Sequence, residues 1–369
     1  MGKYIYNYKS WPAFTWDHEA ITPLLSNIRH KQGRLKGIME VLGFSLRNET
    51  LLETLTLDVL KSTEIEGELL NPAQVRSSIA KRLGMDIAGL VPADRHVEGV
   101  VEMMMDATQN YNAPLDKDRL FGWHSALFPT GRSGIHTIIV GNWRDNAKGP
   151  MQVVSGAMGK EKVHYEAPGA ETLEQEMNVF LEWFNTEHTI DAVLKSAIAH
   201  LWFVTVHPFD DGNGRIARAI ADMQLARADG DRQRFYSMSA QIRLERNDYY
   251  SILERTQQGT LNITDWLEWF LNCLDRSLNV TDDSLRRVLS KTKFWDRHAQ
   301  TSVNERQRML INKLFDGFTG KLNSSKWAKI AKCSTDTALR DINDLLQKNI
   351  LEKEAGGGRS TSYILKEGI

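Results

Sequence analysis

Residues 207–218 read HPFDDGNGRIAR and contain most of the side chains that could carry chemistry. Glycines on both sides of Asn213 free the backbone to turn its N–H groups toward one point. The residues after Gly214 have helical spacing, so the positive end of a helix is expected at the same point. Backbone N–H groups and a helix N-terminus together bind anions. The pattern therefore predicts a phosphate-binding loop.

Charged side chains in the same segment extend this hypothesis. Arg215 and Arg218 lie at i and i+3 of the first helical turn, so they share a face. A cation at a helix N-terminus is unfavourable unless an anion compensates it, and a polyphosphate would be such an anion. Asp211 is a hard oxygen donor that could bind Mg²⁺ alongside phosphate oxygens. His207 titrates where it can take a proton from a hydroxyl nucleophile. Phe209 is expected to anchor the loop. Singly, each residue is also explained as part of a turn.

The complete string matches HPFx(D/E)GNGRxxR at every specified position, and the chain resembles the Fic family over most of its length. The resemblance implies a mainly α fold that transfers AMP from ATP to a Tyr, Thr or Ser hydroxyl of a target protein. It makes His207 the general base and Asp211 the ligand of Mg²⁺, with Mn²⁺ as an alternative metal. It assigns ATP phosphate binding to Gly212, Asn213, Gly214, Arg215 and Arg218.

A second Fic signature lies upstream, where residues 62–67 read STEIEG and fit the inhibitory pattern (S/T)xxxE(G/N) through Ser62, Glu66 and Gly67. Glu66 falls in the last turn of a predicted helix, the unfavourable end for a carboxylate unless a cation lies opposite. The resemblance names Arg218 as that cation. Pairing with Glu66 would keep Arg218 from the γ-phosphate, so the resemblance implies autoinhibition.

The resemblance also points to an adenine site and a target-binding flap. Adenine is expected beside the helix after the core, where Tyr249, Tyr250 and Gln257 fall, although packing explains a tyrosine pair equally well. Residues 131–169 are rich in glycine and β-forming residues and predict a loop with a short β-hairpin. Within them, 149–164 is expected to pair with an extended segment of the target. The expected packing or surface histidines are His96, His124, His136, His188 and His200.

Helical periodicity over the remaining sequence predicts three parts. Residues 1–93 form a helical regulatory region with the inhibitory helix at about 50–67, and 94–285 form the catalytic core. Residues 286–369 form a linker helix and a winged helix-turn-helix, since three helical segments precede two strand-like segments joined by GGGR. Asn71 before Pro72, and Asp94, are the predicted helix starts upstream of the core.

Composition limits the partners. The formal net charge of −1 gives the chain no overall attraction to nucleic acid or to a membrane. The expected recognition helix, 334–348, carries two basic residues against three aspartates, so DNA binding and protein docking both stay open for the winged helix. The start of the chain does not read as a signal peptide, and no apolar run is long enough to cross a bilayer. Cys273 and Cys333 form no CxxC pair. These features predict a cytoplasmic protein.

Alternative functions and partners also stay open. The same site could remove AMP, with Glu66 positioning a water, or use another nucleotide donor. A DNA-binding regulator with the Fic core as a sensor is a third alternative. The expected partners are an unidentified target protein, the chain itself through self-modification, and a second copy in a homodimer, because similar proteins self-associate.

Overall fold

The computed structural model describes residues 4–41, 43–85, 89–147, 149–156, 162–315, 318, 320–354 and 361–366. The chain divides into two compact units, Met1–Val280 and Thr281–Ile369. The predicted regulatory region and catalytic core therefore belong to one compact unit. The boundary between the units falls within one helix, α11 (Thr264–Arg297), five residues before the boundary expected from the sequence.

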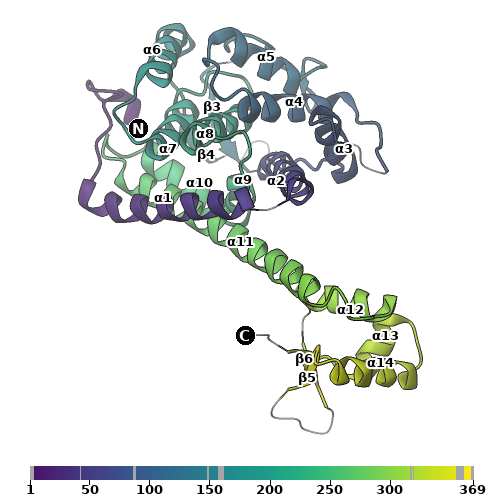
Figure 1. Cartoon of the computed structure of the whole chain (residues 1–369). Helices are drawn as coiled ribbons and strands as arrows, with labels where there is room; N and C mark the ends of the chain where they lie inside the picture. The colour runs from purple at the N-terminus through teal and green to yellow at the C-terminus, as the bar shows by residue number, and fades with distance from the viewer. Residues whose placement is uncertain are drawn as a thin grey trace. The chain divides into compact units, whose positions relative to one another are not determined.

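Helices build most of the first unit, which confirms the mainly α fold class (Figure 1). In chain order they are the 3-10 turn η1 (Ile5–Asn7), α1 (His18–Val41), α2 (Phe44–Ile65), α3 (Pro72–Arg82), α4 (Arg95–Gln109), α5 (Lys117–Leu127), the 3-10 turn η2 (Ala170–Thr172), α6 (Leu173–Thr186), α7 (Ala192–Val206), α8 (Asn213–Asp229), α9 (Met238–Leu244), α10 (Arg246–Gln257) and the start of α11. Asn71 and Asp94 cap α3 and α4 as predicted, each accepting from backbone N–H groups of the first turn.

Helices α7 and α8 lie at the centre of this unit (Figure 1). The α7 sequence AVLKSAIAHLWFVTV is apolar on nearly all sides, and every side chain from Val193 to Val206 is buried. Burial on all sides fixes the position of the end of α7. The loop that joins α7 to α8, residues 207–212, therefore starts from a rigid point in the core.

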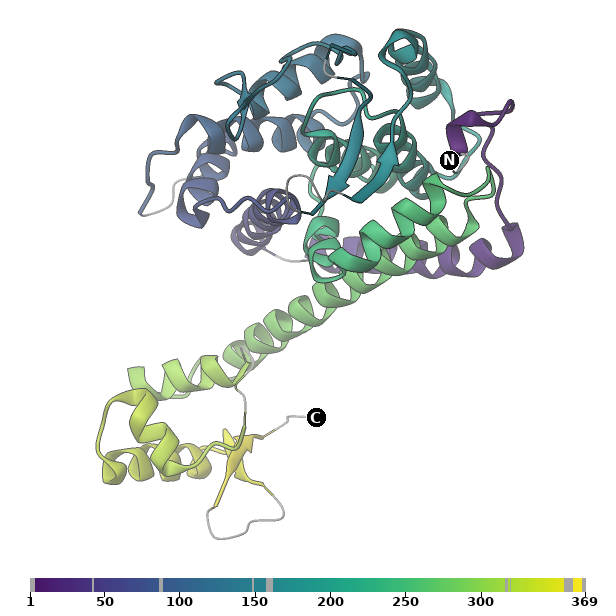
Figure 2. The ribbon, with the colours of Figure 1, turned by 180° about the vertical axis from the view of Figure 1, so that it is seen from behind.

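Residues 131–169 form two short antiparallel hairpins, where the sequence predicted one. The first pairs β1 (Arg132–Ser133) with β2 (His136–Thr137), and the second pairs β3 (Gln152–Ser155) with β4 (Lys162–Glu166). The second hairpin corresponds to the expected flap and lies over the core helices (Figure 2). Residues 157–161, at its turn, lie outside the described residues. Tyr165 on β4 donates its hydroxyl hydrogen to Thr205 O, which ties the hairpin to the end of α7.

A buried ion cluster docks α2 onto the rest of the unit. Asp58 on α2 is fully buried and accepts from Arg234 at 2.9 Å and from the Ser237 hydroxyl. Arg234 also pairs with Asp222 on α8. Removing one partner of a buried ion pair costs about 3–5 kcal/mol, because the other charge is left unpaired. The cluster therefore makes undocking of α2 costly.

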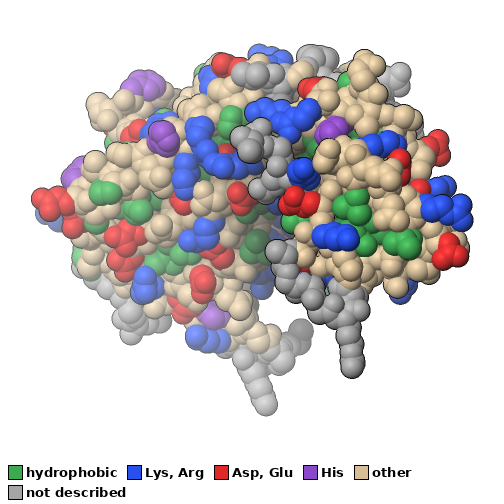
Figure 3. Space-filling model, turned by 60° about the horizontal axis from the view of Figure 1, so that its bottom comes forward, with side chains coloured by type: hydrophobic (Ala, Val, Ile, Leu, Met, Phe, Trp, Pro, Cys, Tyr) green, Lys and Arg blue, Asp and Glu red, His purple; other side chains and the backbone are tan. Residues whose placement is uncertain are grey.

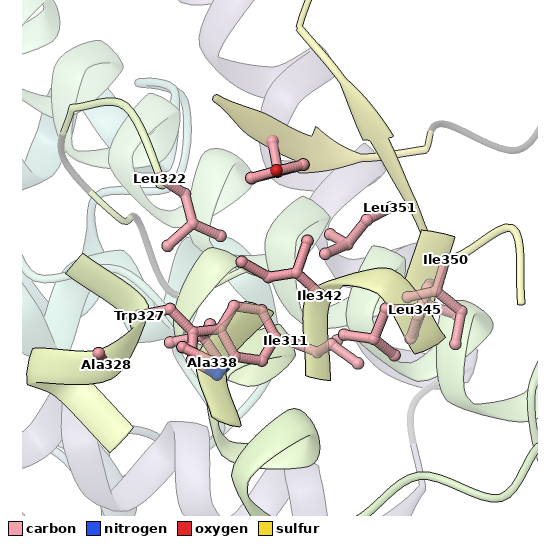
Figure 4. Close-up of a cluster of buried hydrophobic side chains, with 12 residues drawn as sticks. Ile311, Leu322, Trp327, Ala328, Ala338, Ile342, Leu345, Ile350 and Leu351 are labelled. Atoms are coloured by element: carbon pink, nitrogen blue, oxygen red, sulfur yellow. The ribbon is translucent and has the colours of Figure 1, made fainter. Parts of the chain in front are cut away.

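The second unit has the predicted order of three helices followed by two strands. They are α12 (Glu305–Phe315), α13 (Ser324–Ala331), α14 (Thr335–Gln347), β5 (Leu351–Lys353) and β6 (Tyr363–Leu365). Trp327 is fully buried among the side chains of these elements, and Figure 4 shows Ile311, Ile342 and Leu345 gathered with it. The GGGR sequence at 356–359 lies outside the described residues.

The acidic residues of α14 face its own unit rather than solvent alone. Asp341 accepts from Arg306 at 3.0 Å and from Asn304 at 2.9 Å, and Asp344 accepts from Gln307 at 2.8 Å. Two of the three aspartates counted against DNA binding thus stabilise the contact between α12 and α14. In Figure 3, acidic and basic side chains are both scattered over the face in view.

Candidate active site

The residue at the end of α7, His207, has a left-handed backbone with φ of +51°. Arg144, which is almost fully buried, holds it there. Its Nε donates to His207 O at 2.7 Å, its Nη2 donates to Pro168 O at 2.6 Å, and its backbone N–H donates to Pro208 O at 2.9 Å. A cation at a helix C-terminus also compensates the helix dipole. Arg144 thereby fixes the backbone that carries the predicted base.

The His207 side chain is arranged to accept a proton. Its Nδ1 lies 3.2 Å from Val204 O, and because a carbonyl can only accept, Nδ1 carries the hydrogen and Nε2 keeps its lone pair. Burial lowers the pKa of His207 to about 4, and the Arg144 cation acts in the same direction. The imidazole is therefore neutral near pH 7, with Nε2 free to act as a base.

Asn213 gives the loop its shape. Its Nδ2 donates to Phe209 O at 2.8 Å, and its Oδ1 accepts from Phe209 N at 3.0 Å, which closes the loop with a pair of hydrogen bonds. Phe209 is fully buried, as expected of an anchor. Gly212 precedes the first residue of α8 with φ of +80°, a conformation that favours glycine. The first backbone N–H groups of α8 lack intrahelical partners, as at any helix start, and they lie where the sequence predicts an anion site.

Asp211, the predicted metal ligand, is fixed through both its side chain and its backbone. Ser133 on β1 donates to Asp211 Oδ2. His124 on α5 is fully buried; its Nδ1 must accept from Gly141 N at 3.1 Å, so its Nε2 carries the hydrogen and donates to Asp211 O at 3.2 Å. Burial lowers the pKa of His124 to about 4, which keeps this arrangement neutral. The His124 ring stacks on the Phe209 ring, with 4.2 Å between the ring centres.

The structure brings the predicted inhibitory residues onto Arg218. Arg218 Nε donates to Ser62 Oγ at 2.9 Å, and its Nη2 donates to Ser62 O and to Glu66 Oε1, both at 2.7 Å. Glu66 Oε1 also faces Gly214, where a Cβ would lie only 2.2 Å away. The carboxylate of Glu66 therefore occupies the N-terminus of α8, the place where a phosphate would lie.

Arg215 has its own carboxylate partner. Its side chain is 2% exposed, its Nη1 donates to Glu68 Oε2 at 3.0 Å, and its guanidinium lies 5.0 Å from the Phe128 ring centre. Among the described residues, no acceptor lies within hydrogen-bond reach of its Nε. A buried cation with an unused donor suits a further anionic ligand.

Of the three expected adenine-side residues, Tyr250 hydrogen-bonds to the inhibitory carboxylate. Tyr250 donates its hydroxyl hydrogen to Glu66 Oε2 at 3.2 Å. Tyr249 is 1% exposed and lies beneath it, with its hydroxyl 2.8 Å from His200 Nε2. Gln257 is also buried and donates to Val204 O at 3.3 Å. Tyr249 and Gln257 thus support the site from the core.

Comparison with known proteins identifies the loop's family. Residues 114–225 match the Fic/DOC family, and residues 4–85 match a domain of unknown function, DUF4172. The chain carries a Fic domain. Arg218 falls within the Fic match and Glu66 within the DUF4172 match, so the ion pair joins the two matched regions.

The relatives found by the comparison are distant in sequence. Proteins named protein adenylyltransferase Fic from Drosophila yakuba and Drosophila melanogaster are each 26% identical over 318 residues, which cover 81% of this chain. Those residues cover 57% and 58% of the relatives, so the chain spans little more than half their length. The crystal structure of a Fic family protein from Desulfovibrio desulfuricans G20 has a TM-score of 0.55 at 22% identity, covering 97% of this chain and 99% of that one.

Sequence reasoning missed four residues of the Fic site. Arg144, His124, Ser133 and Glu68 act through contacts with residues far away in the sequence, which no local pattern reveals. His136 and His188 are exposed and His200 is buried, in line with the packing or surface roles expected for them.

Within the described residues, no helix combines the length and apolar composition needed to cross a membrane.

Proposed function

We propose that this Fic protein transfers AMP from ATP to a hydroxyl group of a target protein. The observation that carries the proposal is the convergence of three features at the start of α8. They are the free Nε2 of His207, the backbone N–H groups of the helix N-terminus, and two buried arginines that face anions. The names of the Drosophila relatives support the same reaction.

The proposed step needs one base and one anion site. The oxygen of the target hydroxyl attacks the α-phosphorus of ATP, and its proton passes to His207 Nε2. The bond between the α-phosphorus and the bridging oxygen breaks, and pyrophosphate leaves with that oxygen. The N-terminus of α8, Arg215 and Arg218 would hold the charge of the β- and γ-phosphates. The β3–β4 hairpin would position an extended segment of the target by strand pairing.

The residues around Asp211 fit a magnesium ion that is shared with ATP. Among the described residues, no group of three or more His, Cys, Asp or Glu side chains gathers as a metal site of its own. Mg²⁺ is commonly held by one or two carboxylates, with phosphate and water oxygens completing the octahedron. Asp211 would supply the protein oxygen, and Mn²⁺ could take the same place. The metal would neutralise charge on the leaving pyrophosphate.

Replacing His124 by phenylalanine should weaken the use of Mg²⁺. The phenyl ring would keep the stacking on Phe209, but Asp211 O would lose its donor and the partly buried Gly141 N–H would lose its acceptor. The expected cost in the free energy of unfolding is about 1–3 kcal/mol. In addition, the Mg²⁺ concentration for half-maximal transfer should rise severalfold, measured in a Glu66→Gly background.

His200→Phe is the matched control for this prediction, because His200 is also buried but contacts Tyr249 rather than Asp211. It should lower thermal stability without changing the Mg²⁺ requirement. Equal Mg²⁺ curves for the two variants would show that His124 does not position Asp211.

The carboxylate of Glu66 would hold this reaction back. It competes with phosphate both for Arg218 and for the N-terminus of α8. Arg246 holds the same turn from the other side, since its Nε donates to Ile65 O at 2.6 Å, and the Tyr250 hydroxyl lies beside it, donating to Glu66 Oε2. The inhibitory turn is therefore fixed between α8 and α10, and ATP would bind productively only when Glu66 is displaced.

Transfer of radiolabel from α-³²P-ATP to protein, in a lysate that contains targets, tests the proposed function. The Glu66→Gly variant should label protein with α-³²P-ATP and leave it unlabelled with γ-³²P-ATP, because pyrophosphate departs. Labelling by γ-³²P-ATP would instead indicate a kinase reaction. No labelling from either ATP, with labelling from another α-labelled nucleotide, would change the proposed donor. Loss of label from purified AMP-modified protein would favour AMP removal.

Transfer should stay active at mildly acidic pH. His207 acts as a base only when neutral, and its lowered pKa of about 4 means that the neutral form is lost as the pH falls through 4, not through 6.5. At saturating Mg²⁺, kcat/KM of the Glu66→Gly variant should therefore change little between pH 8 and about pH 5.5. An acidic limb centred near pH 6.5 would contradict the assignment of a desolvated His207 as the base.

A further inference from the structure

Both arginines of the proposed phosphate site are held by the same short segment. Glu66 pairs with Arg218 at 2.7 Å, and Glu68 pairs with Arg215 at 3.0 Å. The two guanidinium groups are each 2% exposed, whereas the carboxylates of Glu66 and Glu68 are 30% and 45% exposed. Each buried cation is thus covered by an acidic side chain that reaches it from the solvent side.

The backbone between the two carboxylates explains how both reach α8. Glu66 is the last capping residue of α2, and Gly67 follows with φ of +89°, which reverses the chain. Glu68 then reaches Arg215, which lies one turn before Arg218 on α8. His96, at the start of α4, places its Nε2 3.4 Å from Glu68 Oε2, the oxygen that also accepts from Arg215. The hydrogen bond from His96 and the Arg215 cation lower the pKa of the Glu68 carboxyl, so it is ionised at neutral pH.

We propose that Glu68 is a second inhibitory residue, which blocks Arg215 as Glu66 blocks Arg218. This inference rests on the proposed function, because it assigns Arg215 to ATP phosphates. A phosphate bound to Arg215 would bring its negative charge beside the Glu68 carboxylate, so the two anions compete for the charge of the same guanidinium. Residues 66–68 therefore keep both arginines from the ATP phosphates. Removing the Glu66 carboxylate alone leaves Arg215 paired with Glu68.

An alternative role for Glu68 makes the opposite prediction. If Glu68 orients Arg215 for ATP, the contact helps binding, and its removal lowers the affinity for ATP. If Glu68 competes with ATP, its removal raises that affinity. The sign of the change in Kd separates the two roles.

Glu68→Gln tests the inference in the full-length protein, with Glu64→Gln as the matched control. Glu64 lies on the same helix end but pairs with Lys61 and Arg243, away from α8. Isothermal titration with Mg²⁺·ATP should show binding about fivefold tighter for Glu68→Gln and unchanged for Glu64→Gln. Titration with AMP, which lacks the β- and γ-phosphates, should give equal Kd values for both. Glu66→Gly/Glu68→Gln should also transfer label from α-³²P-ATP severalfold faster than Glu66→Gly.

The outcomes distinguish this inference from the proposed function. Active label transfer by Glu66→Gly, with no gain in ATP affinity or rate from Glu68→Gln, would overturn the second inhibitory contact alone. Weaker ATP binding by Glu68→Gln would assign Glu68 to orienting Arg215 and would also overturn it. Absence of ATP binding and of transfer in every variant, with melting temperatures near that of the wild type, would overturn both.

Discussion

Replacing His207 by asparagine should abolish label transfer while leaving Mg²⁺·ATP binding within about twofold of the parent variant. The substitution removes the only group at the loop whose free nitrogen can take the hydroxyl proton, and a general base contributes about 10²- to 10⁴-fold to the rate. The proposed phosphate site uses the N-terminus of α8 and the two arginines, none of which the substitution changes, so binding is expected to persist. Transfer is measured in the Glu66→Gly background, where activity is expected, and binding by calorimetry.

The choice of asparagine follows from the backbone. His207 has a left-handed conformation, which asparagine adopts more readily than alanine, so loop geometry is kept and the lost activity reports the base. His207→Ala should behave in the same way, with somewhat lower stability. The exposed His188→Ala serves as a control and should transfer at the parent rate. Substantial transfer by His207→Asn would mean that another group takes the proton.

The sequence predicted the loop well because its determinants are local. Asn213 and Phe209 are four residues apart, and their paired hydrogen bonds close the loop without help from distant residues. The cap of α3 by Asn71 is also local, and the structure has it where the sequence placed it. Local features of this kind depend on a few neighbouring residue types, which the sequence displays directly.

The contacts that position the loop from outside could not be predicted in the same way. Arg144 reaches His207 from 63 residues away, and His124 reaches Asp211 from 87 residues away. A single sequence gives no signal for such pairs, because any buried arginine or histidine could serve many backbone carbonyls. The interpretation of His124 as a packing residue was therefore incomplete: its ring packs on Phe209, but its nitrogens hold Asp211.

The lengths of the helices were also predicted only in part. α5 and the seven-residue α9 were not predicted, and α2 starts six residues earlier than the periodicity indicated. Short helices owe most of their stability to tertiary packing rather than to intrinsic propensity, so their sequence signal is weak. α11 runs from Thr264 to Arg297, across the predicted boundary between the core and the linker helix at residue 285.

Replacing Glu66 by glycine should raise the rate of label transfer by about tenfold or more. The change removes the carboxylate from Arg218 and from the N-terminus of α8, and both then become available to phosphate. Glu66→Gln should give a smaller increase, because the amide keeps the side chain in place but loses the charge. The measurement compares initial rates from α-³²P-ATP for the three proteins at equal concentration.

This increase should arise without release of α2 from the core. The backbone of Glu66 has φ of −82° at the end of the helix, where glycine causes little strain, and the Asp58–Arg234 pair and the bond from Arg246 to Ile65 O do not involve its side chain. Melting temperatures of wild type and Glu66→Gly should therefore be close. Glu64→Gln, which removes a neighbouring carboxylate that does not contact α8, should leave the rate unchanged. If Glu64→Gln activated as strongly as Glu66→Gly, loosening of the helix end, rather than release of Arg218, would explain the activation.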